Sequence, residues 1–179
     1  MALLETEDVL KRGVEEIIIE KEFVEKLDSG KSLRLKMGFD PSAPDIHLGH
    51  AVGLRKLRQL QELGHKVVLI VGDWTAQIGD PSGRSQTRNM LSAEEVNANA
   101  QTYLDQFFKI VDRDRTEIRL QSEWFGPFSL ANVIELTSKF TVAQILARDD
   151  FAKRFNENQP IAITELLYPL LQAYDSVAI

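Results

Sequence analysis

Cysteine is absent from this chain of 179 residues. Disulfide bonds and thiolate metal sites are therefore excluded. The chain also lacks any apolar run of about 18 residues, the length that a membrane-spanning helix requires. Residues 1–11 alternate acidic and apolar side chains and lack the basic start and apolar block of a secretory signal. These absences predict a cytoplasmic protein with no membrane segment.

Positive charge is in the minority, with 21 Lys and Arg against 27 Asp and Glu, a formal net charge of -6. This balance argues against broad electrostatic binding of nucleic acid, although it leaves local basic patches open. Hydrophobic residues make up 44% of the chain, an ordinary value for a globular domain. The length is sufficient for one well-buried core, and a second full domain is not expected.

Strand and helix patterns alternate along the first half of the chain. Residues 5–28 carry apolar side chains at helical spacing and predict one or two amphipathic helices. Residues 33–39 predict a strand, 48–63 a helix, and the β-branched run 67–71 a strand buried on both faces. The helix is expected to bury a side made of Leu48, Val52, Leu57, Leu60 and Leu63. This β-α-β unit places the chemistry beyond the carboxyl ends of the strands.

The second half continues the alternation. Residues 72–88 form a polar, glycine-bearing segment that we expect to be a functional loop because of its length. A capping box at 92–95 opens a helix, 117–121 predicts a third strand, and a final helix starts near Thr164. The chain is therefore expected to have an α/β fold, with a Rossmann-like parallel sheet, flanking helices and an N-terminal helical segment.

Two histidines, His47 and His50, stand at the start of the helix that follows the first strand. Because they are three residues apart, they share one helix face. Metal binding is one interpretation, but no third ligand lies nearby in the sequence. Imidazole and backbone N–H groups at a helix N-terminus also suit a phosphate whose charge grows in a transition state.

Two groups of polar residues follow in the sequence. Asp80 lies in a Gly-Asp-Pro-Ser-Gly turn, where an aspartate is often only a turn residue. Arg84 and Arg88 are four residues apart, and such surface pairs are usually solvated charges. By sequence pattern alone, these residues are compatible with a structural role or with a binding loop.

The last helix carries Tyr168, Gln172 and Asp175 at steps of four and three residues, so they share one face. Polar side chains on a packed face are costly unless they are hydrogen-bonded. The spacing fits either an exposed polar stripe or a polar wall of a binding pocket.

Three blocks of sequence together resemble a known family. Residues 39–50, Phe-Asp-Pro-Ser-Ala-Pro-Asp-Ile-His-Leu-Gly-His, resemble the signature of class I aminoacyl-tRNA synthetases in the form carried by tyrosyl-tRNA synthetases. The similarity continues at 79–84, Gly-Asp-Pro-Ser-Gly-Arg, and at 168–175, Tyr-Pro-Leu-Leu-Gln-Ala-Tyr-Asp. The blocks keep the order of the family, and the similarity covers essentially the whole chain.

The resemblance implies a role for each matching residue. ATP, bound with Mg²⁺, would contact Gly38, Asp40, Ser42, His47, Gly49 and His50. Tyrosine would contact Lys36, Thr75, Asp80, Tyr168, Gln172 and Asp175. His47, His50, Arg84 and Arg88 would be the catalytic residues. Magnesium would arrive with ATP, so no dedicated protein metal site is expected.

Lys36 departs from the family pattern. Many tyrosyl enzymes have a second tyrosine at this position, two residues before the glycine of Gly-Phe-Asp. An ammonium group can donate a hydrogen bond to a phenol oxygen but cannot accept one. A direct bond from Lys36 to the phenol of the substrate is a hypothesis.

The resemblance implies that the parent enzyme is a tyrosine–tRNA ligase. It divides the chain into an N-terminal helical segment, 1–32, and the N-terminal part of the catalytic domain, 33–179, with a homodimer-forming helical insertion at about 126–163. The second signature loop and the regions for tRNA(Tyr) would lie beyond Ile179, so the isolated chain is expected to be inactive or weakly active. The alternatives are a non-catalytic folded fragment, a tRNA-independent nucleotidyltransferase and a tryptophanyl-type synthetase.

Overall fold

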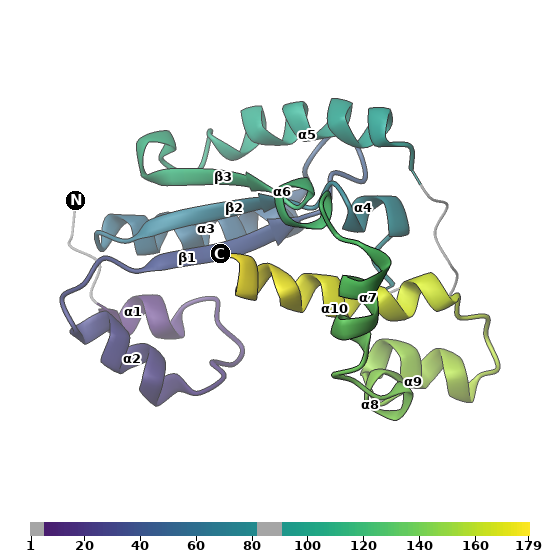
Figure 1. Cartoon of the computed structure of the whole chain (residues 1–179). Coiled ribbons are helices and arrows are strands. Elements are labelled where there is room, and N and C mark those ends of the chain that lie inside the picture. Colours follow the sequence, from purple (N-terminus) through teal and green to yellow (C-terminus); the bar gives the residue numbers. More distant parts are fainter. Residues whose placement is uncertain (1–5, 82–90) are drawn as a thin grey trace.

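The fold is built on three parallel strands in the order β1-β2-β3 (Figure 1). They are β1 (Arg34–Phe39), β2 (Lys66–Val71) and β3 (Thr116–Leu120). The structure is a computed structural model and describes residues 6–81 and 91–179. The predicted α/β architecture and each of its three strands are confirmed.

Helices cover both faces of the sheet. They are α1 (Thr6–Lys11), α2 (Glu20–Asp28), α3 (Leu48–Glu62), α4 (Thr75–Ile78), α5 (Ala93–Phe107), the 3₁₀ helix η1 (Arg113–Arg115), α6 (Ser122–Phe125), α7 (Leu130–Thr137), α8 (Val142–Leu146), α9 (Asp149–Asn156) and α10 (Ile163–Ala178). α4 lies inside the segment 72–88 that the sequence predicted as a loop, so that prediction is wrong for four residues. No helix in the described part of the chain is both long and apolar enough to cross a membrane.

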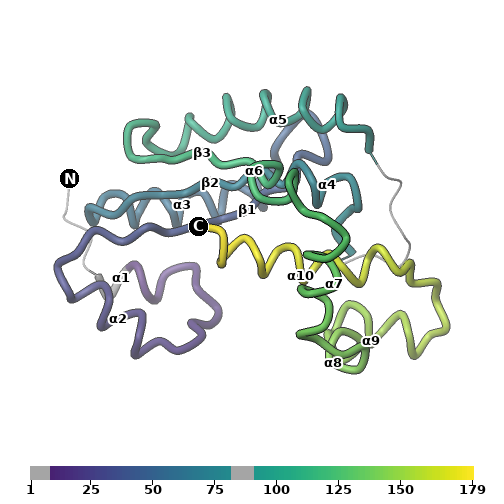
Figure 2. The backbone as a smooth tube through the Cα atoms, in the orientation of Figure 1, coloured from purple at the N-terminus to yellow at the C-terminus, as the bar shows by residue number. Residues whose placement is uncertain are grey.

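The central strand β2 divides the core into two layers. Val67 and Leu69 pack with α3 and α5 on one face, and Val68 and Ile70 pack with α6 and α10 on the other. Successive side chains of a strand point to opposite faces, so a strand covered on both sides is apolar at every position. The tube in Figure 2 shows α10 running along the opposite side of the sheet from α3.

The prediction for the buried side of α3 is partly wrong. Leu57 and Leu60 are buried, together with Leu54, but Leu48 is 86% exposed and Val52 is 63% exposed. At 3.6 residues per turn, nine residues place Leu57 about half a turn from Leu48, so the two cannot share a face. Gly49, His50 and Gly53 in the first turns of α3 line the cavity described below, whereas Leu48 and Val52 do not.

The N-terminal segment packs on α3 through α1. Val9 is buried there, and Lys56 of α3 donates to the carbonyls of Val9 and Arg12, both at 2.7 Å. These bonds satisfy carbonyl groups at the end of α1, which no helical N–H can reach. Ile18, one of the apolar residues of the predicted helical segment 5–28, is exposed.

A buried ion pair joins α9 to the start of α10. Arg154 Nη1 lies 2.5 Å from Glu165 Oε2, and both side chains are 3% exposed. Glu165 also accepts the N–H of Ala162 at 2.8 Å. Because a buried charge is costly without its partner, this pair ties the first turn of α10 to α9.

Candidate functional site

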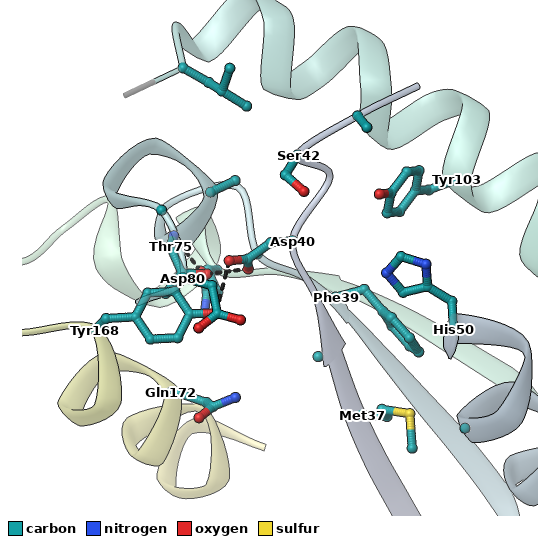
Figure 3. Close-up of a pocket in the computed structure, with 18 of the residues that line it drawn as sticks. Met37, Phe39, Asp40, Ser42, His50, Thr75, Asp80, Tyr103, Tyr168 and Gln172 are labelled. Atoms are coloured by element: carbon teal, nitrogen blue, oxygen red, sulfur yellow. Dashed lines mark hydrogen bonds between the residues drawn. The ribbon is translucent and has the colours of Figure 1, made fainter. Parts of the chain in front are cut away.

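A cavity of about 780 Å³ opens at the carboxyl ends of the strands. The predicted site residues Gly38, Asp40, Ser42, His47, Gly49, His50, Thr75, Asp80, Tyr168, Gln172 and Asp175 all line it. In Figure 3, Tyr168 and Gln172 of α10 lie across the cavity from His50 of α3, with Asp40 and Asp80 between them. Arg84 and Arg88 lie outside the described residues, and Lys36 does not line the cavity.

The two histidines cap the start of α3. His47 Nδ1 accepts the N–H of Gly49 at 3.1 Å, and His50 Nδ1 accepts the N–H of His47 at 3.2 Å. In neutral imidazoles these bonds leave the proton on Nε2 of each ring. The rings stack with their centroids 4.0 Å apart. The capping therefore leaves each ring with an Nε2–H donor that the helix backbone does not use.

His50 sits among aromatic rings. Its centroid lies 5.9 Å from that of Phe39 and 5.7 Å from that of Tyr103, whose ring meets it edge-on. Burial, and next the charge of His47, lower the pKa of His50 from its ordinary value. The site therefore favours the neutral ring, whose Nδ1 can keep its capping bond.

The glycine at position 49 is required by close approach. A Cβ added there would lie 2.9 Å from two atoms of the His47 ring. Real Cβ atoms are essentially never that close to another atom, so a side chain would displace the ring. Glycine therefore permits the cap that His47 makes.

Asp40 connects the first strand to two other elements. Its Oδ1 accepts from Thr75 Oγ1 at 2.6 Å, and its Oδ2 accepts from the hydroxyl of Tyr168 at 2.8 Å. A Cβ at Gly72 would lie 2.1 Å from Asp40 Oδ1 and 2.5 Å from Thr75 Oγ1. Asp40 thereby links the end of β1 to α4 and to α10.

Asp175 is 2% exposed and is held by side chains that follow β3. Gln121 Nε2 lies 3.1 and 3.0 Å from its two oxygens, and Trp124 Nε1 donates to Oδ1 at 3.2 Å. Burial raises the pKa of the Asp175 carboxyl. The hydrogen bond from Gln121, the charge of Lys36 and the bond from Trp124 oppose that rise.

Gln121 was missed as a site residue by sequence reasoning. Its Oε1 accepts the backbone N–H of Thr75 at 3.0 Å, while its Nε2 holds Asp175. It directly follows β3, and the carboxyl end of a parallel strand was the signal that could have singled it out. Tyr103 of α5 also lines the cavity and was not predicted as a site residue.

No group of three or more His, Cys, Asp or Glu that could hold a metal ion occurs in residues 6–81 and 91–179. The polar groups of the cavity are instead divided between N–H donors at the start of α3 and carboxylates nearer to α10. Such a division suits a ligand that is anionic at one end and carries a cation and a hydroxyl at the other.

Comparisons with known proteins identify relatives of this chain. The family model for class I tRNA synthetases of the tryptophan and tyrosine type matches residues 28–179. A tyrosine–tRNA ligase of Dehalococcoides mccartyi strain CBDB1 is 71% identical over 97% of this chain, and one of Thermotoga maritima is 61% identical over 96%. The chain spans only 44% and 43% of the lengths of these relatives.

Solved structures agree on the fold. A C-terminally truncated mitochondrial tyrosyl-tRNA synthetase of Aspergillus nidulans superposes with a TM-score of 0.78 at 20% identity. The match covers 94% of this chain and 52% of that one. At 20% sequence identity, this structural similarity shows the fold alone.

Proposed function

The chain belongs to the family of class I tRNA synthetases for tryptophan and tyrosine, and on that premise we propose that the protein carrying it is a tyrosine–tRNA ligase. The observation that carries the choice of tyrosine is Asp175, a buried carboxylate in the same cavity as the two capping histidines. It accepts three hydrogen bonds from protein groups and can accept a further one from a phenol.

In this proposal the cavity has two halves. The phosphate half consists of Ser42, His47, Gly49 and His50, and receives ATP with its Mg²⁺. The amino-acid half consists of Thr75, Asp80, Gln121, Tyr168, Gln172 and Asp175, and receives tyrosine. Asp40 joins the halves, because it bonds to Thr75 and Tyr168 of the amino-acid half and lies two residues before Ser42 of the phosphate half.

The first reaction needs no covalent enzyme intermediate. An oxygen of the tyrosine carboxylate attacks the α-phosphorus of ATP, and the α–β bridging oxygen leaves with pyrophosphate. Nε2–H groups of His47 and His50 donate to phosphate oxygens whose charge grows in the transition state. Arg84 and Arg88 are proposed to bind the leaving pyrophosphate. In the second reaction a hydroxyl of the terminal ribose of tRNA attacks the tyrosyl carbonyl, and AMP leaves.

The amino-acid half orients tyrosine at both ends. Asp80, Tyr168 and Gln172 receive its ammonium group, and Asp175 accepts from its phenol. Phenylalanine would leave Asp175 without that partner, a loss that rejects a substrate more strongly than shape does. Tyrosyl-tRNA synthetases are the usual illustration of this effect.

The test is tyrosine-dependent ATP–pyrophosphate exchange and tRNA charging by the full-length protein. Tyrosine should support both, and phenylalanine and tryptophan should support neither. Charging with tryptophan would assign the other branch of the family, and exchange without charging would favour a tRNA-independent nucleotidyltransferase. The 179-residue chain, assayed beside its His47→Ala variant, should show no exchange above that control.

Lys36 is proposed to assist phenol binding through its charge. It opposes the rise in the pKa of Asp175 and so favours the ionised acceptor. Lys36→Ala should weaken tyrosine binding and reduce discrimination against phenylalanine, as measured by calorimetry with both amino acids. Unchanged affinities for both would remove Lys36 from the site.

The segment 126–163 is proposed to form a homodimer interface. Its exposed apolar side chains include Leu130, Ile134, Val142, Phe155 and Ile163, the last of which is 82% exposed. Exposed apolar side chains that form a contiguous patch mark interaction sites, and this segment carries several such side chains. Ile163→Asp should shift the sedimentation coefficient from dimer to monomer, whereas a wild-type chain that sediments as a monomer would contradict the proposal.

A cytoplasmic location also stays a prediction.

A further inference from the structure

The segment 40–47, here called the signature turn, joins β1 to α3 and makes few backbone hydrogen bonds of its own. Pro41 and Pro44 have no N–H group to donate. Within residues 40–46, all of them described, one backbone bond closes inside the turn, from the Ser42 N–H to the Asp40 carbonyl at 2.8 Å. The shape of the turn must therefore depend on partners outside it.

Those partners come from α5. Asn99 Nδ2 donates to the Pro41 carbonyl at 3.0 Å, and Gln106 Nε2 donates to the Pro44 carbonyl at 3.2 Å. Gln106 also accepts the N–H of Ile46 through Oε1 at 3.1 Å. One glutamine thus satisfies a donor and an acceptor on either side of Asp45, close to the residue that starts the cap of α3.

The same helix also contacts the chain on both sides of the turn. Thr102 Oγ1 is a further donor to the Pro44 carbonyl. The ring of Tyr103 meets His50 edge-on, and the ring of Phe107 lies 4.6 Å from that of Phe39. The contacting residues of α5 are Asn99, Thr102, Tyr103, Gln106 and Phe107, at the spacing of one helix face.

We propose that α5 holds the signature turn in shape, and that Gln106 and Tyr103 are positioning residues for the phosphate half. This inference rests on the proposed function, because what the turn positions is the pair of Nε2–H donors on His47 and His50. Gln106 fixes the backbone that enters the cap, and Tyr103 fixes the ring plane of His50. Neither residue needs to touch tyrosine.

The expected kinetic signature follows from this division. Misplacing a donor by about 1 Å can cost roughly 100-fold in rate. Loss of Gln106 should therefore lower kcat for pyrophosphate exchange and leave the KM for tyrosine nearly unchanged, because the amino-acid half keeps its own contacts. A variant that only folds less completely would contain fewer active molecules, but its folded molecules would keep His50 in place.

The experiment compares Gln106→Ala with Gln101→Ala in the full-length protein. Gln101 lies on the same helix, is exposed and is not among the α5 residues that contact the turn, so it matches the substitution without the contact. Gln106→Ala is expected to lower kcat roughly tenfold to 100-fold. Gln101→Ala is expected to match the wild type. Equal kcat values for the two variants would overturn the proposal, whereas a wild-type enzyme without exchange would overturn the proposed function instead.

Hydrogen exchange gives a readout that does not depend on activity. The Ile46 N–H donates to Gln106, so a peptide spanning residues 42–50 should exchange faster in Gln106→Ala than in Gln101→Ala. Gln106→Glu keeps the acceptor for Ile46 but loses the donor to Pro44, so both its exchange rate and its kcat should fall between those of wild type and Gln106→Ala. Unchanged protection in Gln106→Ala would show that the turn holds its own shape.

Tyr103 is tested by a conservative pair of substitutions. Tyr103→Phe keeps the ring that meets His50, and Tyr103→Leu removes it. The NMR titration of His50 should stay near that of wild type in Tyr103→Phe and move in Tyr103→Leu, with kcat falling only in the latter. Identical titrations in both variants would remove Tyr103 from the proposal, even if Tyr103→Leu lowered the melting temperature.

Discussion

At the amino-acid half of the cavity, Thr75, Gln121 and Asp175 are each 2% exposed and bond to one another. At the phosphate half, Ser42 and His47 are exposed, and the backbone there is held by side chains of α5. The first half is preorganised by its own buried network, which suits recognition of one side chain. The second half keeps open N–H donors for a ligand and draws its shape from a neighbouring helix.

The largest expected effect is on the phosphate half. His50→Ala removes an Nε2–H donor proposed to act on growing phosphate charge, and loss of one such donor costs roughly 100- to 1,000-fold in kcat. The KM for tyrosine should stay close to that of wild type, because the network around Asp175 is untouched. Steady-state pyrophosphate exchange by the full-length protein measures both. A raised KM for tyrosine with unchanged kcat would reverse the assignment of the two halves.

The next largest effect is on the amino-acid half. Asp175→Asn replaces one carboxylate oxygen by an NH₂ group, which would face the N–H donors of Gln121 or Trp124. Hydrogen bonds to charged groups are worth about 1.5–3 kcal/mol, so tyrosine affinity should fall roughly tenfold to 100-fold. Calorimetric titration with tyrosine, and separately with ATP, checks this. Equal losses for both ligands would mean that the halves are not separable.

A smaller effect is expected where the two halves meet. Gly72→Ala would place a Cβ 2.1 Å from Asp40 Oδ1 and 2.5 Å from Thr75 Oγ1, which breaks the bond between them. Overpacking of this kind costs about 1–3 kcal/mol in the free energy of unfolding. Gly38→Ala is the control, because its nearest contact would be an ordinary 3.9 Å. Urea unfolding that ranks the two variants equally would contradict the crowding at Gly72.

The smallest expected effect is on the free energy of unfolding, which should depend on pH with opposite sign for His50 in one half and Asp175 in the other. Burial and the charge of His47 lower the pKa of His50, so the unfolded chain takes up this proton first as pH falls below about 6.5, and the free energy of unfolding decreases. Burial raises the pKa of Asp175, so the folded chain takes up that proton first. The Asp175 contribution therefore increases as pH falls and is lost as pH rises through its folded pKa.

Urea unfolding of the purified chain between about pH 7.5 and 4.5 separates these contributions. His50→Gln should flatten the decrease in the free energy of unfolding below neutral pH, whereas Asp175→Asn should steepen it. His65, whose pKa burial also lowers, should leave a residual slope in His50→Gln. Parallel curves for wild type and both variants would mean that neither group is linked to folding.

Periodicity predicted most of the elements because they are local. The β-branched run 67–71 and the capping box at Ser92 each specify a strand or a helix start from neighbouring residues alone. The prediction for α3 was partly wrong because Leu48 and Val52 were placed on the same side of the helix as Leu57 and Leu60. Leu48 and Val52 lie on the side of α3 opposite to Leu57, a point that helix geometry could have settled beforehand.

The resemblance of short blocks to a known family singled out His47, His50, Tyr168 and Asp175, whereas their spacing alone left structural roles open. The spacing could not show which residues, distant in the sequence, contact these side chains. Gln121 meets Asp175 across 54 positions of sequence, and Gln106 meets Ile46 across 60. Such contacts depend on how strands and helices pack, and hydrogen-bond geometry between distant segments leaves no local pattern. Short blocks of sequence thus determined which side chains line the cavity. The orientation of these side chains was decided by the packing of strands and helices.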